Sequence, residues 1–196
     1  MDFNLPHVVF LLGTSAYLAI RAVFQYRTAS NTKEVHKTSA RDRILVMLVG
    51  ASQIGMPLLL FFTPWLSGAN YAPLPANLWL GTAVMLGALW LFWRSHADLG
   101  LSWSVSLELN TNHQLITRGV YHGLRHPMYA SFFAMGLAQG ILLSNWLAGW
   151  AALVAVAALY VVRVPEEEKM MLEYFGDEYR AYMRSTGGIL PRMRAA

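Results

Sequence analysis

Two polar clusters in this 196-residue chain carry side chains that can bind charged groups or transfer protons. The first is Arg125-His126-Pro127, at the start of an apolar segment, and the second is Arg163 followed by three glutamates at 166–168. Imidazole and carboxylate groups serve as general acids and bases, and guanidinium groups bind anions. Each cluster also has a structural interpretation, because proline is favoured at the first position of a helix and carboxylates in a first turn complement the helix dipole.

Metal chemistry is a weaker interpretation of the histidines. His122 and His126 have the four-residue spacing that presents two ligands on one helix face, but Gly123 and Pro127 interrupt a continuous helix there. The chain has no HExxH pattern and no cysteine, so thiolate ligands, thiolate nucleophiles and disulfides are excluded. We therefore expect no metal site.

The composition indicates that these clusters are positioned by membrane helices. Hydrophobic residues make up 56% of the chain and charged residues only 13%, whereas soluble domains carry about 25% charged residues. A helix needs ~20 apolar residues to cross the hydrocarbon core. Five apolar segments come close to this length: Val8–Phe24, Ile44–Leu66, Leu78–Trp93, Met128–Leu143 and Trp146–Val162.

The last two segments and the polar stretches beside them have the clearest pattern. Only Ser144-Asn145 separates the two segments, which predicts a helical hairpin, and Gly136-x-x-x-Gly140 predicts close helix packing. The loop 94–127 is long for a connector, and long loops tend to be functional. After the hairpin, Pro165 is expected to start a new amphipathic helix. Its apolar face would carry Met171, Phe175, Tyr179 and Tyr182.

The distribution of lysine and arginine predicts the topology. Fourteen of the 15 basic residues flank the apolar segments on one side, and Arg21 can snorkel to that side. We expect an all-α integral membrane fold with five transmembrane helices, an outside N-terminus, and a cytosolic C-terminal amphipathic helix. Residues 1–93 would form an N-terminal transmembrane region of three helices, and 94–196 a C-terminal catalytic region. Nucleic-acid binding is not expected, because the basic residues are spread over several membrane-proximal loops.

The second half of the chain resembles a known enzyme family. "HQLITRGVYHGLRHPMY", the apolar hairpin, "RVPEEEKMMLEYFGDEYRAYM" and a terminal "LP" are together similar to the isoprenylcysteine carboxyl methyltransferase family. They also resemble the wider group that includes phospholipid N-methyltransferases. The resemblance covers residues 103–191, while the first ninety residues carry no diagnostic motif. It implies an integral membrane methyltransferase that uses S-adenosylmethionine and releases S-adenosylhomocysteine.

The same resemblance implies roles for individual residues. Arg163 would face the methyl acceptor as the catalytic residue. The cofactor would be bound by His113, Gln114, Leu115, Ile116, Tyr121, His126, Pro127, Met128, Tyr129 and Glu167. These side chains suit the ligand, because S-adenosylmethionine needs an acidic group for its amine, hydrogen-bonding groups for adenine and ribose, and aromatic surface near its sulfonium.

Three functions remain open at this point. The first is methylation of a lipophilic or lipidated carboxylate of the prenylcysteine type, which is already nucleophilic and favours a cation such as Arg163 beside it. The second is N-methylation of a lipid headgroup, which needs a general base to remove a proton. The third is a non-catalytic membrane binding or transport protein, although the internal repeats typical of transporters are not evident. All three imply contact with membrane lipids.

The predicted topology can be tested with reporter fusions. A reporter in the segment 67–77 and a reporter at the C-terminus should report opposite sides of the membrane, because the basic residues gather on one side only. Finding both reporters on the same side would rule out the five-span arrangement.

Overall fold

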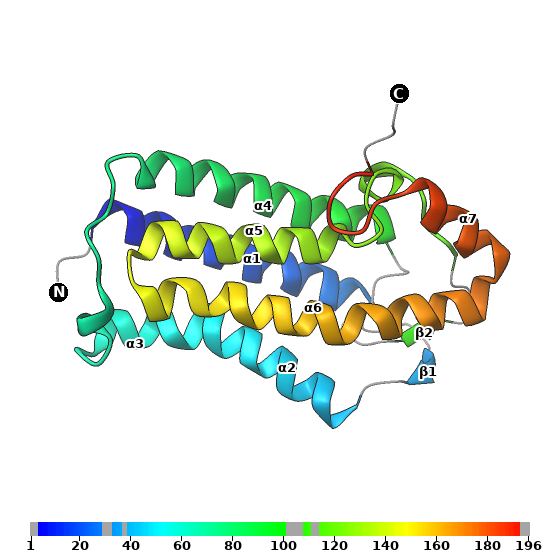
Figure 1. The fold of residues 1–196 in the computed structure, drawn as a ribbon, viewed down its shortest axis with the longest axis horizontal. Coiled ribbons are helices and arrows are strands. Elements are labelled where there is room, and N and C mark those ends of the chain that lie inside the picture. Colours follow the sequence, from blue (N-terminus) through cyan, green and yellow to red (C-terminus); the bar gives the residue numbers. More distant parts are fainter. Residues whose placement is uncertain (1–3, 29–32, 37–38, 101–107, 111–113, 193–196) are drawn as a thin grey trace.

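A computed structural model describes residues 4–28, 33–36, 39–100, 108–110 and 114–192. The long helices lie side by side in one bundle, and a small two-stranded ribbon lies at one end of it (Figure 1). The helices and strands are α1 (Leu5–Thr28), β1 (Lys33–His36), α2 (Ala40–Gly50), the π-helical η1 (Ala51–Gly55), α3 (Met56–Phe62), the 3₁₀ turn η2 (Ser67–Ala69), α4 (Asn77–Leu99), β2 (Glu108–Asn110), the 3₁₀ turn η4 (Gly119–His122), α5 (Pro127–Leu143), α6 (Trp146–Phe175) and α7 (Asp177–Ser185).

The helices have the lengths and composition of a membrane protein. Within the described residues, four helical stretches are long and apolar enough to span a membrane, namely Leu5–Thr28, Ala40–Phe62, Asn77–Leu99 and Trp146–Phe175. The fifth apolar helix, α5, has 17 residues and packs between α4 and α6. The protein is thus a multi-pass helical membrane protein, as expected, while the number of five spans stays a prediction. The antiparallel ribbon of β1 and β2 was not expected from the sequence.

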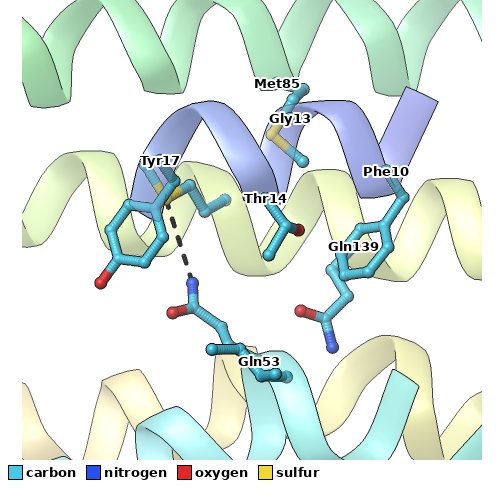
Figure 2. A pocket seen from close by; sticks show the side chains of 9 residues that line it. Phe10, Gly13, Thr14, Tyr17, Gln53, Met85 and Gln139 are labelled. Carbon is cyan, nitrogen blue, oxygen red and sulfur yellow. Dashed lines mark hydrogen bonds between the residues drawn. The ribbon is translucent and has the colours of Figure 1, made fainter. Parts of the chain in front are cut away.

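The second membrane helix is continuous from α2 to α3 but contains a π-helical turn. In a π-helical turn, a backbone carbonyl accepts a hydrogen bond from the N–H five residues later. For the carbonyl of Ser52 that residue is Pro57, which has no N–H to donate. Gln139 of α5 replaces that donor, with its Nε2 2.9 Å from the Ser52 oxygen and 2.6 Å from the Ala148 oxygen. Gln53, in the same turn, points toward α1 and α5 (Figure 2), and its Nε2 lies 4.0 Å from the sulfur of Met135. The buried amides thus connect three helices.

The predicted hairpin of α5 and α6 is confirmed. Ser144 adopts a left-handed conformation with φ 47°, and the Asn145 side chain caps α6 by accepting from the N–H groups of Leu147 and Ala148. The helices approach closely along small residues, as Gly136-x-x-x-Gly140 predicts. A Cβ on Gly136 would lie only 3.0 Å from the backbone nitrogen of Leu153. This close approach fixes the distance between α5 and α6.

The expected helix start at Pro165 is wrong. α6 runs without interruption through Pro165 to Phe175, and the break comes at Gly176, whose φ is +56°. Proline is tolerated inside membrane helices because neighbouring helices support the backbone, and α6 buries Leu159, Val164 and Met170 on both sides of it. A C-terminal helix does follow, but α7 is only nine residues long. Met171 and Phe175 therefore belong to α6, while Tyr179 and Tyr182 belong to α7.

We predict that Gly136→Ala destabilises the protein by about 1–3 kcal/mol, because the added methyl group would press on backbone that cannot rotate away. Gly87→Ala in α4 is the matched control, since a Cβ there meets nothing within 4 Å. That control should be neutral or stabilising by up to about 1 kcal/mol, as alanine is the better helix former. Thermal unfolding in detergent measures both, and equal midpoints for the two variants would contradict the proposed packing.

Candidate active site

The Glu167 carboxylate is the centre of a polar cluster where α5 and α6 meet. The Tyr129 hydroxyl donates to its Oε1 at 2.9 Å, and the Arg163 Nε lies 3.2 Å from the same oxygen. Arg163 and Glu167 are four residues apart on α6, so their side chains project from the same helix face. The Arg163 side chain is only 10% exposed, which makes this ion pair stronger than a surface pair.

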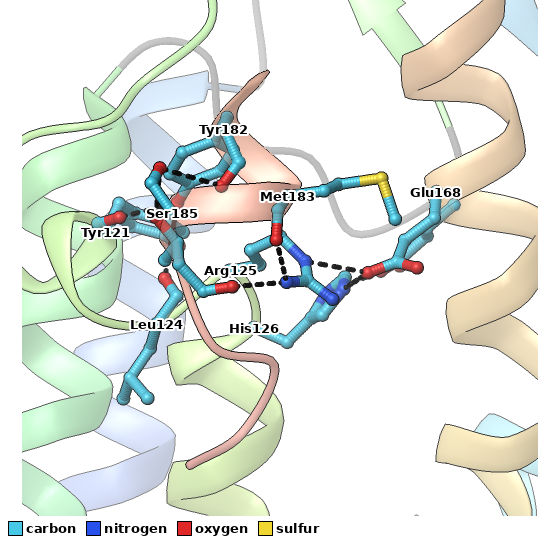
Figure 3. A network of polar contacts seen from close by, with 10 residues as sticks. Tyr121, Leu124, Arg125, His126, Glu168, Tyr182, Met183 and Ser185 are labelled. Carbon is cyan, nitrogen blue, oxygen red and sulfur yellow. Dashed lines mark hydrogen bonds and ion pairs between the residues drawn. The ribbon is translucent and has the colours of Figure 1, made fainter. Parts of the chain in front are cut away.

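His126 lies between two carboxylates of α6. Its Nε2 is 3.0 Å from Oε1 of Glu168, and its Nδ1 is 3.7 Å from Oε2 of Glu167. Arg125 shares the first carboxylate, with its Nε 2.9 Å from the same Oε1 of Glu168 (Figure 3). The residues before α5 are thus joined to α6 by charge-assisted hydrogen bonds, which are stronger than neutral ones.

The segment that follows α7 fixes the start of α5. The backbone N–H groups of Arg125 and His126 donate to the carbonyls of Gly187 and Gly188, at 2.7 and 3.1 Å. The Arg125 guanidinium also donates to the carbonyls of Met183 and Thr186 (Figure 3). A Cβ at Gly187 would lie 1.9 Å from the Leu190 carbonyl oxygen, so only glycine fits this tight turn. Arg125 therefore has a structural role in addition to its ion pair.

Two tyrosines connect the loop before α5 to α4 and α7. The Tyr182 hydroxyl donates to the Tyr121 carbonyl at 2.5 Å, and the Tyr121 hydroxyl lies 3.4 Å from the carbonyl of Ser95. Burial raises the pKa of Tyr121 well above its ordinary value, and it raises that of Tyr182 to about 12 against the opposing charge of Arg125. Both hydroxyls therefore keep their protons at neutral pH and act as donors.

A cavity of about 250 Å³ opens beside the cluster, between α1, α2, η1, α5 and α6. Apolar side chains such as Val49, Phe132 and Leu159 form most of its lining. Its polar lining includes Arg163, Glu167 and Tyr129 together with Arg21, Tyr17 and Gln53. The cavity therefore joins membrane-embedded apolar surface to charged groups, which suits a lipophilic molecule with a polar end.

Asp42 adds a buried carboxylate on the α2 side of the cluster. It closes a capping box with Ser39, whose hydroxyl lies 2.7 Å from Oδ2, and only 2% of the residue is exposed. Its Oδ1 has no hydrogen-bond partner in the described part of the chain, and its charge interacts with that of Arg163. The guanidinium of Arg163 is therefore under the influence of carboxylates from two helices.

The structure brings together four of the residues predicted for the site: His126, Tyr129, Arg163 and Glu167. Pro127 is the first residue of α5, and Met128 lines the cavity. Tyr121 lies within electrostatic range of Glu167. The other predicted residues lie apart from this cluster. Leu115 lines a separate open groove of about 490 Å³ against α7, Gln114 is exposed, Ile116 is half-buried, and His113 lies outside the described residues.

Sequence reasoning missed the contributions of Glu168 and Asp42, and it identified Arg21 only as a residue that can snorkel to the membrane surface. In the sequence Glu168 is only one member of an acidic run, and the family resemblance indicates its neighbour Glu167. The capping pattern of Ser39 and Asp42 could have been found in the sequence, but its proximity to Arg163 could not. The described residues contain no group of three or more metal-ligating side chains that could hold an ion.

Part of this chain is similar to a family of known proteins. Residues 79–173 match the model of the isoprenylcysteine carboxyl methyltransferase family. The chain is 30% identical over 95 residues to protein-S-isoprenylcysteine O-methyltransferase of Schizosaccharomyces pombe, covering 48% of this chain and 40% of that protein. The enzymes of that name from Tribolium castaneum and Homo sapiens are 34% and 32% identical over 87 residues, which is 44% of this chain and 31% of each relative. The match thus spans less than half the length of these relatives.

The fold extends the likeness beyond the matched segment. A solved structure described as the eukaryotic intramembrane Ras methyltransferase, isoprenylcysteine carboxyl methyltransferase, superposes with a TM-score of 0.57 and 23% identity. The superposition covers 93% of this chain and 67% of the other, so helices on both sides of residues 79–173 share its fold. Residues 79–173 are thus similar to the isoprenylcysteine carboxyl methyltransferase family, and the chain shares the fold of a solved structure described by that name.

Proposed function

We propose that this protein is an integral membrane methyltransferase that transfers a methyl group from S-adenosylmethionine to a lipophilic carboxylate of the prenylcysteine type. The observation that carries this proposal is the position of Glu167. Its carboxylate contacts Tyr129 and Arg163 beside a membrane-embedded cavity, while His126 connects it to the polar end of the bundle. The names of the similar relatives supply the class of acceptor.

The side chains of the cluster fit the methyl donor. Glu167 is the acidic group for its amine, and its side chain is 22% exposed, so a ligand can reach it. Tyr129 and Tyr160, whose ring centres are 5.6 Å apart, offer aromatic surface to a sulfonium. His126 and Tyr121 supply hydrogen-bonding groups. His113, Gln114, Leu115, Ile116, Pro127 and Met128 complete the proposed cofactor site.

The proposed reaction needs no proton transfer. A carboxylate oxygen of the acceptor attacks the methyl carbon of S-adenosylmethionine, so that a C–O bond forms, the C–S bond breaks, and its electron pair stays on sulfur as S-adenosylhomocysteine. The task left to the protein is alignment, which contributes much of the rate in displacement reactions. Arg163 can orient the acceptor because its planar guanidinium matches a carboxylate in two hydrogen bonds.

N-methylation of a lipid amine is less well supported. An ammonium acceptor needs a base close to the reaction, and within the described part of the chain Glu167 is the only carboxylate that lines the cavity. That carboxylate is already paired with Arg163, and the other charged lining residue, Arg21, would repel an ammonium group. A non-catalytic role in binding or transport is not favoured either, since the similar relatives are named as methyltransferases.

We propose that the end of the bundle with the site faces the cytosol. The loops at 63–76 and 144–145 lie at the opposite end, on the same side as the start of α1 (Figure 1). The site end carries Arg94, Arg118 and Arg125, in agreement with the positive-inside rule. The water-soluble cofactor would then enter from the cytosol and the acceptor from the bilayer.

Glu167→Gln should weaken the binding of S-adenosylhomocysteine roughly tenfold to more than a hundredfold, because a charge-assisted contact is worth ~1.5–3 kcal/mol. His126→Ala should also weaken it. Isothermal titration calorimetry of the purified protein in detergent provides the measurement. Glu166→Gln is the matched control: its side chain is 45% exposed and pairs with Arg41, which is also exposed, so the affinity should stay unchanged. Wild-type affinity in both Glu167→Gln and His126→Ala would refute the cofactor site.

Arg163→Lys should lower the rate of methyl transfer at least ~10-fold, since lysine keeps the charge but loses the planar fork. Cofactor affinity and the unfolding temperature should stay nearly constant, because lysine can still pair with Glu167 on the next turn. Arg41→Lys, on the exposed partner of Glu166, is the control and should keep full activity. If Arg163→Lys loses cofactor binding or unfolds early in proportion to its lost activity, Arg163 has a structural role only.

A further inference from the structure

Arg21 of α1 lines the same cavity as Arg163, although the two residues are 142 positions apart in the sequence. α1 and α6 begin at the same end of the bundle and run in the same direction (Figure 1). Arg21 lies 16 residues after the start of α1, and Arg163 lies 17 residues after the start of α6. At 1.5 Å per residue, both are roughly 25 Å along their helices. Two guanidinium groups therefore reach the cavity at about the same depth.

The side chains that line this cavity include two arginines, Arg21 and Arg163, and one glutamate, Glu167. Arg163 is paired with Glu167, the only carboxylate among the described residues that line the cavity. Arg21 forms no ion pair with a carboxylate within the described residues, and its charge acts on the side chains of Tyr17 and His96. The described side chains that line the cavity thus carry one positive charge in excess, in surroundings that are mostly apolar, while the Asp42 carboxylate outside the lining interacts with Arg163 and not with Arg21. Such a charge is costly at membrane depth unless it reaches water or acquires a counterion.

The simplest structural explanation is that Arg21 snorkels to the membrane surface. Arg21 is partly buried and lines the cavity, however, whereas Arg27 on the same helix is exposed and lies over the ring of Phe24. The two arginines therefore differ in their surroundings, and only one of them is placed to meet a molecule in the cavity. An anionic group bound there would supply the missing counterion.

We propose that Arg21 is a specificity-determining residue that binds the anionic end of the lipophilic acceptor. This proposal rests on the proposed function and names a recognition residue for it. The apolar part of the acceptor would lie along Leu18, Ile54 and Phe132, and its carboxylate would lie between Arg21 and Arg163. The occupant is a lipophilic carboxylate, because the cavity combines an apolar lining with a net positive charge.

This arrangement separates substrate from product. Methylation converts the carboxylate into an uncharged ester, which can no longer form a charge-assisted hydrogen bond with a guanidinium. Arg21 therefore binds the acceptor more tightly than the methylated product and favours product release. Because Arg21 binds the charge of the ground state, its loss should raise KM for the acceptor more than it lowers kcat.

Measuring how two probe molecules bind to the 196-residue chain in detergent, with S-adenosylhomocysteine present, tests the proposal without turnover. The probes are an N-acetyl-S-prenylcysteine and its methyl ester, titrated into the wild type, Arg21→Gln, Arg21→Lys and the control Arg27→Gln. We expect the wild type and Arg27→Gln to bind the carboxylate at least about 10-fold more tightly than the ester. Arg21→Gln should bind the two within about 3-fold of each other, and Arg21→Lys should show an intermediate preference.

An unchanged preference in Arg21→Gln, or no preference in the wild type, overturns the proposal. If Arg21→Gln does not fold, Arg21→Lys provides the test. A preference for the carboxylate over the ester as strong in Arg21→Lys as in the wild type would overturn the proposal. Competition by an anionic phospholipid as strong as that of the prenylcysteine would assign Arg21 to bulk lipid and also overturn it. Methylation assays separate the two proposals: a preference that depends on Arg21, without methyl transfer to the probe, supports the anion site and contradicts the proposed function.

Discussion

The continuity of α6 through Pro165 is the constraint on which the site depends. Because the helix does not end there, Arg163 and Glu167 stay one turn apart and form an ion pair on a nearly buried face. The same continuity carries Glu168 beyond the apolar part of the helix, to Arg125 and His126. A break at Pro165 would have turned the glutamates away from the arginine and separated the cavity from the polar end of the bundle.

The opposite end of the hairpin determines whether Tyr129 can reach Glu167. Gly136 and Gly149 allow α5 and α6 to approach until their backbones nearly touch, and Asn145 fixes the turn between them. The side chains between helices in such close contact can shift only a little, because packed interiors leave little free space. At the other end of α5, backbone hydrogen bonds to the segment that contains Gly187 hold the residues before the helix in place. Packing far from the chemistry therefore sets the 2.9 Å contact between Tyr129 and Glu167.

Charge at membrane depth links this architecture to the proposed function. Arg21, Asp42, Arg163 and Glu167 come from three helices and lie around apolar surface where unpaired charge is costly. Glu167 and Asp42 compensate the charge of Arg163 within the protein, whereas Arg21 pairs with no carboxylate among the described residues and is the charge left for a ligand. A carboxylate acceptor fits this excess, and its conversion to an ester removes the attraction. The same electrostatics can thus serve recognition and release.

The sequence by itself determined what depends on neighbours along the chain. Apolar length marked the membrane helices, Ser144-Asn145 marked the hairpin, and Pro127 marked the first turn of α5, because these signals act within a few residues. The family motif singled out Tyr129, Arg163 and Glu167, and the structure places them in contact, although their roles stay predictions. Only the tertiary structure decided that α6 passes through Pro165, that Glu168 pairs with Arg125, and that Arg21 shares a cavity with Arg163. These features depend on packing between distant helices, for which a single sequence carries no local signal.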